Sequence, residues 1–310
     1  MQSQVVFECR TACVQQVQHY GKRLEHSDPV KHFDRYQGAT QVDKQARIVY
    51  ESWRAMINLY SGLKFTYLED KLVALAGLAM VMQQQAKDEY LAGIWRSDLG
   101  LGLLWERTGA GQSDQTDIWD PAEPYVAPSW SWASMNHRVH WDDLIFSSGG
   151  RSLVSLLGTH LSSADDDPTG RLLRHSHITV SGRIIQTMCR FTSQFLMDKQ
   201  LEVSIHDHTY NSWLVYDDPA KHSYCNRLAR VSLVVGPLQM GPLLYLPIAY
   251  CPVEAYGTRL HGILLHPAGP EEHFRRIARL EVHIAPAELE ELLLRSDRLE
   301  SERVREIVLV

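Results

Sequence analysis

Hydrophobic positions recur with two different periods along this chain, and the change of period divides it in two. Between residues 43 and 98, apolar side chains return every three or four positions; the first series comprises Ile48, Val49, Trp53, Met56, Ile57 and Tyr60. This spacing places them on one face of an amphipathic helix. Residues 72–81 are nearly all apolar, which predicts a second helix over residues 68–84 that is buried on most of its sides. The first part of the chain is therefore predicted to be helical.

Residues 109–128 are rich in glycine and proline, and after them the hydrophobic period shortens to two. Short apolar runs then alternate with turn signals such as Gly236-Pro237 and Gly241-Pro242, which is typical of an antiparallel sheet. The predicted strands are 178–185, 201–205, 213–216, 231–235, 243–248, 263–265 and 277–284.

These elements predict an α+β fold that forms one compact unit. A mainly helical N-terminal part, residues 1–120, is expected to pack on a C-terminal antiparallel β-barrel or sandwich, residues 121–310. A terminal helix is expected from Pro286, because proline suits the first helical turn and Glu288 lies at the positive end of the helix dipole.

Composition narrows the class of protein. The 310 residues carry a net charge of −6, which disfavours nucleic acid as a partner. No stretch approaches the roughly 20 apolar residues that span a bilayer, so no membrane partner is expected. The five cysteines are odd in number and scattered, which favours a reducing compartment over a disulfide framework. We therefore expect a cytoplasmic protein.

Several familiar catalytic signatures are missing from the sequence. There is no GxxxxGK[ST] or GxGxxG for nucleotide phosphates, no GxSxG nucleophile elbow, and no CxxC or HExxH. Two HxH pairs, His175–His177 and His206–His208, could each place two imidazoles on one face of a strand. A metal site needs a third and usually a fourth ligand, and none is spaced recognisably. We therefore predict no cofactor and no metal.

Tryptophans gather before the β part and suggest two alternatives. Trp130 and Trp132 alternate with serines in PSWSWAS, and Trp95 precedes them. In an extended chain both indoles of this motif would face one side and the hydroxyls the other. The three tryptophans either pack between the helical part and the sheet, joining the two, or line an apolar pocket that binds a substrate.

Polar side chains with catalytic potential lie near the same region. His137 and His140 are candidate acid or base groups, although a polar loop would account for them too. Arg183 is a candidate cation for a substrate oxygen. Arg275 and Arg276 would face opposite sides of a strand, so one of them could point inward and would then need a carboxylate or a ligand anion.

Several pieces of the chain resemble the region that follows the HET domain in fungal heterokaryon-incompatibility proteins. They occur in the same order and at similar spacing: Tyr60-Ser61, Asp70-Lys71-Leu72, Tyr90-Leu91-Ala92-Gly93-Ile94-Trp95, Leu103-Leu104-Trp105 and Ala127-Pro128-Ser129-Trp130-Ser131-Trp132-Ala133-Ser134. Residues 6–10 resemble the end of the HET domain itself, so the effector half is expected to be missing. The resemblance brings no catalytic residue with it.

Two functions follow as expectations. The first is binding of an apolar small molecule, a terpenoid or polyketide, with cofactor-free cyclisation or cycloaddition (pericyclase-like or isomerase) in fungal specialised metabolism. Trp95, Trp130 and Trp132 would bind the substrate, and His137, His140 and Arg183 would be the catalytic residues. We favour it because a shell without its effector has little to do in incompatibility.

The alternative is a non-enzymatic interaction or regulatory module derived from an incompatibility protein. An interaction module should expose an apolar patch, whereas the enzyme should enclose an apolar pocket with a few polar groups.

Overall fold

The structure is a computed structural model, and its chain forms two compact units, Met1–Lys44 and Gln45–Val310. In the first unit, β1 (Val6–Cys9), β2 (Ala12–Val17) and β3 (Tyr20–Arg23) form a small antiparallel sheet.

The predicted strand at 231–235 lies outside the described residues. Those residues are 6–9, 12–17, 20–23, 41–107, 125–142, 145, 150–163, 169–191, 200–206, 208–216, 239–253, 257–269, 273–298 and 303–310.

The second unit opens with helices, as predicted. Helix α1 (Gln41–Tyr60) buries most of the expected face, including Trp53 and Ile57, but Ile48 is exposed. The single helix predicted over residues 68–84 is instead two helices, α2 (Asp70–Val73) and α3 (Ala76–Ala86). A further short helix, α4, covers Leu99–Gly102. In the part of the chain that the structure describes, no helix combines the length and apolar character needed to cross a bilayer.

The prediction that the helix over 68–84 is buried on most sides was wrong for α3. This helix buries Ala79, Met82 and Ala86, but it leaves Leu78 and Met80 exposed, together with Val81. Apolar composition therefore did not report burial here, because nothing in the described structure covers the outer side of α3.

The largest structural element of the second unit is one ten-stranded sheet. Its pairing order runs β13-β12-β11-β14-β15-β16-β17-β10-β9, with β8 paired to β14, and every pairing is antiparallel except β16–β17. The strands are β8 (Arg151–Ser152), β9 (Ser155–His160), β10 (His177–Gly182), β11 (Ile185–Phe191), β12 (Gln200–Ile205), β13 (His208–Tyr216), β14 (Gln239–Val253), β15 (Gly257–Pro267), β16 (His273–Ile284) and β17 (Arg305–Leu309).

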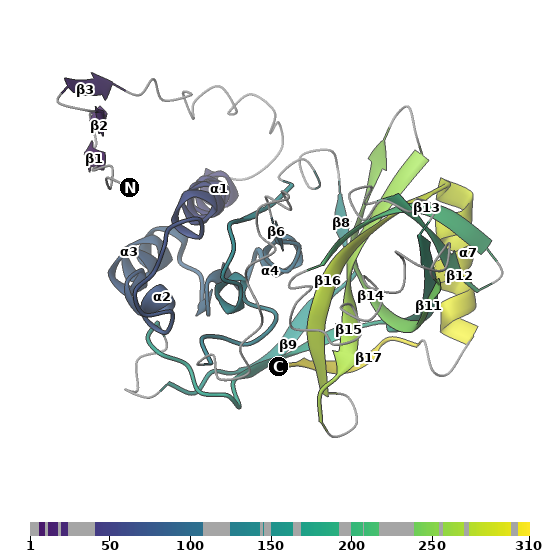
Figure 1. Cartoon of the computed structure of the whole chain (residues 1–310). Coiled ribbons are helices and arrows are strands. Elements are labelled where there is room, and N and C mark those ends of the chain that lie inside the picture. The colour runs from purple at the N-terminus through teal and green to yellow at the C-terminus, as the bar shows by residue number, and fades with distance from the viewer. Residues whose placement is uncertain are drawn as a thin grey trace, which may run out of the picture. The chain divides into compact units, whose positions relative to one another are not determined.

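Strand β13 pairs with β16 as well as with β12. Helix α7 (Pro286–Arg298) begins at the predicted proline and lies against these strands (Figure 1). Its Leu289 and Leu292 join an apolar cluster with Leu260, Leu264 and Leu280. The chain then continues into β17, which lies between β10 and β16 in the pairing order, so the helix is not the last element as predicted.

A second apolar cluster joins the helical part to the sheet. It combines Trp53 of α1 and Trp105 with sheet residues such as Ile178, Leu246 and Ile263. The molecule is therefore a mixed structure of helices and strands, mostly sheet.

Candidate functional site

A hairpin of two short strands, β4 (Tyr90–Leu91) and β5 (Ile94–Trp95), forms the centre of the helical part. Its turn residues Ala92 and Gly93 have φ angles of 46° and 100°, in the left-handed region that favours glycine. The Gly93 carbonyl accepts two indole N–H groups, from Trp53 Nε1 at 2.7 Å and Trp132 Nε1 at 2.9 Å. This turn is therefore buried, and two indoles share its Gly93 carbonyl as their acceptor. We call this arrangement the Gly93 hub.

The PSWSWAS motif packs on this hairpin rather than lining an open wall. Trp132–Ser134 is a 3₁₀ helix, and Ser131 Oγ donates to the Ala92 carbonyl at 2.5 Å. The expectation of an extended motif with hydroxyls on the opposite side was wrong, because the turn buries Ser131 together with both indoles.

The three tryptophans predicted to bind substrate lie in the protein core. Trp95, Trp130 and Trp132 are 1%, 0% and 0% exposed. The Trp95 ring packs edge-on against Trp53, with 5.5 Å between ring centroids. Among the residues that the structure describes, Nε1 of Trp95 and Nε1 of Trp130 have no hydrogen-bond partner. All three tryptophans belong to the apolar cluster that the helical part shares with the sheet, which fits packing between the two parts better than a pocket wall.

Of the two arginines considered for an inward position, Arg276 on β16 is buried, and it connects the sheet to the helical part. Its Nη1 donates to the Leu103 carbonyl at 2.6 Å and its Nη2 to the Trp105 carbonyl at 2.5 Å. The guanidinium lies 3.4 Å from the centre of the Trp105 ring. The described partners are therefore backbone carbonyls beyond α4 and an indole, where we expected a carboxylate or ligand anion. Carbonyls near a helix end accept a cation readily.

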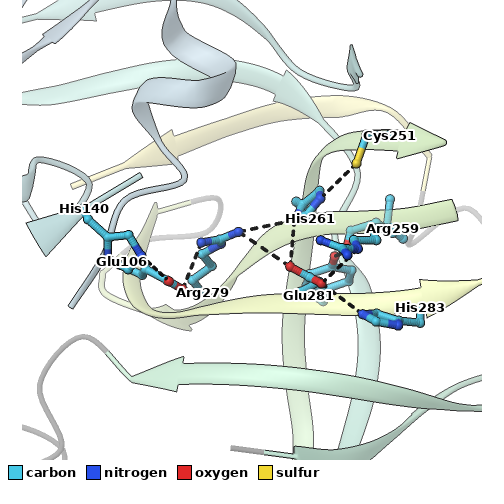
Figure 2. Close-up of polar contacts among 10 residues, drawn as sticks. Glu106, His140, Cys251, Arg259, His261, Arg279, Glu281 and His283 are labelled. Carbon is cyan, nitrogen blue, oxygen red and sulfur yellow. Dashed lines mark hydrogen bonds and ion pairs between the residues drawn. The ribbon is translucent and has the colours of Figure 1, made fainter. Parts of the chain in front are cut away.

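A charged cluster lies where β15 and β16 run side by side, and Glu281 is its centre (Figure 2). Its carboxylate is 2.9 Å from His283 Nε2, 3.4 Å from His261 Nδ1, 3.6 Å from Arg259 Nε and 3.7 Å from Arg279 Nη2. The strand register explains the gathering, because His261 is paired with Glu281 and Arg259 with His283.

His261 connects this cluster to a buried thiol. Its Nε2 lies 3.4 Å from Cys251 Sγ, and its side chain is 0% exposed. Burial, reinforced by the neighbouring Arg279 and Arg259, lowers the pKa of His261 to about 3. Burial likewise raises the pKa of the Cys251 thiol. Both groups are therefore neutral near pH 7, which fits a core cysteine better than a nucleophile.

The charged cluster reaches the helical part through Glu106. Strands β6 (Glu106–Arg107) and β7 (Val139–His140) pair Glu106 directly with His140, and Glu106 Oε1 lies 2.9 Å from His140 Nε2. The other oxygen, Oε2, lies 2.9 Å from Arg279 Nη1. Glu106 thus joins a half-buried imidazole to the guanidinium of β16 (Figure 2).

The predicted catalytic residues have different surroundings. His140 belongs to the charged cluster, and His137 is half-buried in the segment between the 3₁₀ helix and β7. Arg183 follows β10, and its Nη1 donates to the Leu293 carbonyl of α7 at 3.5 Å. These contacts place Arg183 beside α7, whereas His140 contacts β6.

Most members of the charged cluster were missed from the sequence, namely Glu106, Arg259, His261, Glu281 and His283. A signal did exist, because His261 and Glu281 interrupt long apolar strands at positions that share a face with other charged residues. Pairing them, however, requires the register of β15 against β16, which the sequence does not state.

Among the described residues of the second unit, exposed apolar side chains are most frequent along the helical segment at residues 48–81. Of the twelve large apolar side chains that are exposed among the described residues, eight lie between residues 48 and 81 on or beside α1, α2 and α3. We name this surface the helical face; its residues are Ile48, Leu59, Leu63, Tyr67, Val73, Leu78, Met80 and Val81.

Comparisons with known proteins leave the site to be interpreted from its geometry. No protein-family model, no curated protein and no solved structure matches the chain. Among the described residues, no three His, Cys, Asp or Glu side chains are grouped so that they could hold a metal ion.

Proposed function

We propose that this protein is a non-enzymatic interaction module, of the kind expected from its resemblance to the region after the HET domain. The observation that carries the proposal is the gathering of exposed apolar side chains on the helical face. Exposed patches of this kind mark interaction surfaces in folded proteins. The occupant of the face is a second copy of the same chain.

Helix α3 supplies the main argument for the surface. No residue from Leu72 to Ala86 carries a charge. One side of the helix is already buried in the core through Ala79 and Met82, while Met80 and Val81 are 53% and 51% exposed. A helix that is apolar on all sides is typical of an interior position. Covering its outer side removes apolar area from water, which favours association.

The absence of charge along α3 favours a second copy as the occupant. A two-fold contact places each residue of the patch against the same patch on the partner. A charged face would repel itself in such a contact, whereas Leu78, Met80 and Val81 are compatible with their own copies. Two-fold dimers are also the commonest symmetric assemblies.

Sedimentation velocity over a hundredfold concentration range tests this proposal with the full chain. We expect the natural protein to shift from monomer to dimer as concentration rises, and Met80→Glu with Val81→Glu to remain monomeric. Leu157→Glu is the matched control, because Leu157 is 48% exposed but lies on β9. A natural protein that stays monomeric throughout, or a control that dissociates equally, would overturn the dimer.

A second candidate function is the cofactor-free cyclase or isomerase acting on a terpenoid or polyketide. The observation in its favour is the pairing of His140 with Glu106, because a carboxylate can orient an imidazole for acid–base catalysis. In this candidate, His140 exchanges a proton with the substrate and His137 assists it. Arg183 contacts α7 and has no role in the reaction. Trp95, Trp130 and Trp132 support the site as packed scaffold.

Native mass spectrometry with a fungal metabolite extract tests the enzyme candidate. It predicts an adduct of a few hundred daltons that His140→Ala loses and His177→Ala keeps. The enzyme candidate would be contradicted if the natural protein gained no adduct, or if the His140→Ala variant kept it.

The proposal includes two finer points. We infer a closed barrel, rather than a sandwich, for β11–β16; its support is that β13 pairs with both β12 and β16, so the pairing of these six strands returns to its start. A cytoplasmic location is supported by the scattered cysteines.

A further inference from the structure

Gly77 lies at the centre of the exposed side of α3. The buried residues of this helix are Ala79, Met82 and Ala86. Because an α-helix turns by about 100° per residue, these three positions lie about 140–200° around the helix from Gly77. Gly77 is exposed and therefore points directly away from the core. A partner that covers the outer side of α3 has to pass over this residue.

The surroundings of Gly77 on the same side are apolar and uncharged. Met80 and Val81 follow it by three and four residues, so they are its neighbours on the helix surface, and both are exposed. Gln84, about two turns further along, is exposed as well and carries no charge. The outer side of α3 thus places two large apolar side chains next to a residue that has no side chain.

Contacts within the described part of the chain do not account for this glycine. Apart from the backbone of its own helix, no described heavy atom lies within 4 Å of the position that a Cβ would take at Gly77. At Gly93, Gly182 and Gly262, by contrast, a heavy atom lies closer than 3.0 Å to that position. A positive φ does not require the glycine either, because among the described glycines Gly93 and Gly257 have one and Gly77 does not.

Glycine inside a helix is unfavourable, because it loses more backbone freedom on folding than any other residue. Gly77 therefore weakens α3 without a visible benefit to the single chain. A contact between two helices supplies the benefit. Where two helices cross at a small residue, their backbones approach closely and the flanking side chains come into contact.

We infer that Gly77 is the crossing point of the dimer, where α3 packs against α3 of the second copy. This inference rests on the dimer proposed above, and it specifies which residue lies at the two-fold axis. In a two-fold contact the same patch is used on both chains, and a residue at the axis meets its own copy. Gly77 then meets the Gly77 of the second copy, while Met80 and Val81 of both chains pack beside the crossing.

Association that depended on apolar area alone would not need a glycine. Any enlargement of the exposed apolar surface would strengthen such a complex, because more area would leave the water. A close crossing at Gly77 has the opposite requirement, since a side chain at that position would hold the two helices apart. The two models therefore predict opposite effects for the same substitution.

Sedimentation velocity of the full-length Gly77→Leu variant separates these models. We expect its dimer to dissociate at least ten times more readily than that of the natural chain, whereas apolar area alone predicts a tighter dimer. Gly158→Leu is the matched control, because Gly158 lies on β9 and likewise has no described heavy atom within 4 Å of its Cβ position. This control should dimerise like the natural chain.

The melting temperature of each variant, measured at a concentration where the natural chain is monomeric, shows whether the fold is intact. Leucine favours a helix more than glycine does, so Gly77→Leu should melt no lower than the natural monomer. A weaker dimer with an unchanged or higher melting temperature is then an effect on the contact itself.

Disulfide formation tests the position of the axis without adding bulk. A disulfide requires two Cα atoms within about 7 Å of each other. With oxidised glutathione, which takes up the two electrons and two protons and leaves as two reduced molecules, Gly77→Cys should form a covalent dimer. Gln85→Cys should not, because residue 85 is exposed but points about 80° around the helix from Gly77. The natural chain under the same conditions gives the background from its own cysteines.

The outcomes distinguish the crossing point from the dimer itself. If the natural chain stays monomeric, the dimer fails and the crossing point fails with it. If the natural chain dimerises but Gly77→Leu dimerises equally well or better, the dimer stands and the crossing point is overturned. A Gly77→Cys variant that dimerises but forms a disulfide no faster than Gln85→Cys would also overturn it.

Discussion

Two buried interfaces of the second unit hold their polar groups in different ways: one lies within the helical part around Gly93, and the other joins that part to the sheet. Around Gly93 the donors are neutral indoles and a hydroxyl, and their acceptors are backbone carbonyls. Around Glu281 and Glu106 the partners are carboxylates, guanidiniums and imidazoles. Neutral groups lose little when they leave water if each finds one partner, whereas charges need several.

The difference predicts different weaknesses. The indole interface should depend on shape and be nearly insensitive to pH, because none of its hydrogen-bonding groups titrates near neutrality. The charged interface should tolerate small changes of shape but respond to the loss of any single charge and to acid. The following substitutions test this contrast in order of expected effect.

Trp132→Ala should have the largest effect, lowering the free energy of unfolding by about 3–5 kcal/mol. It removes a fully buried indole and one of the two donors to the Gly93 carbonyl. Urea denaturation measures the change. Tyr67→Ala is the control, since Tyr67 is 64% exposed. A stable Trp132→Ala protein that only lost a ligand would instead favour a pocket wall.

Gly93→Ala should lower the free energy of unfolding by about 2–4 kcal/mol, because it adds backbone strain and overpacking. The new Cβ would overlap the indole of Trp132, at a residue with φ of 100°. Gly77→Ala is the matched control: nothing lies within 4 Å of its Cβ position in α3. That change should stabilise the helix by about 0.5–1 kcal/mol. Equal effects at both glycines would refute the hub.

Glu106→Gln should cost about 1–3 kcal/mol by removing the carboxylate between Arg279 and His140. Arg279 is 4% exposed and would lose its shorter ion pair. Glu89→Gln, in a pair with Arg96 that is 43% exposed on both sides, should cost no more than about 1 kcal/mol. Chemical denaturation at neutral pH compares the two, and similar losses would show that burial adds nothing.

His261 should make the charged interface sensitive to acid. Its folded pKa of about 3 lies below the unfolded value of 6.5, so between these values the unfolded chain binds a proton that the folded chain does not. The free energy of unfolding should therefore fall as pH drops from 6.5 toward 3, by up to about 1.4 kcal/mol per unit.

A pH series of denaturation curves measures this slope, and His261→Gln should flatten it. His266→Gln, at an exposed position on β15, should leave the slope unchanged. An unchanged slope in His261→Gln would mean that other groups cause the acid sensitivity.

Elements with a regular hydrophobic period were predictable, and contacts between distant elements were not. The buried face of α1 and most strands follow from spacing, because helices and strands repeat every 3.6 and two residues. The two indoles of PSWSWAS were expected in the right region, but not their turn geometry, which depends on the hairpin beside them. Glu106 and Arg279 are separated by most of the chain, and only the fold brings them together.

The exposed side of α3 illustrates a further limit of the sequence. Its apolar residues predicted burial on most sides, but the side of the helix that carries Met80 and Val81 is exposed in the structure. An apolar composition indicates that burial of a surface is favourable, but it does not indicate whether the same chain or a second copy provides the covering residues.

The position of β17 has a consequence for how the molecule opens and closes. Strands β9 and β10 precede β11–β16 in the chain, yet β17, which is synthesised after all of them, lies between the two groups. Among the described residues, its parallel pairing with β16 involves two pairs, His273 with Val308 and Phe274 with Leu309. Its pairing with β10 joins segments that are far apart in the chain, such as Ile178 with Leu309, and contacts between distant segments form slowly. We expect this seam to be the last part of the sheet to close during refolding and the first to exchange its amide hydrogens.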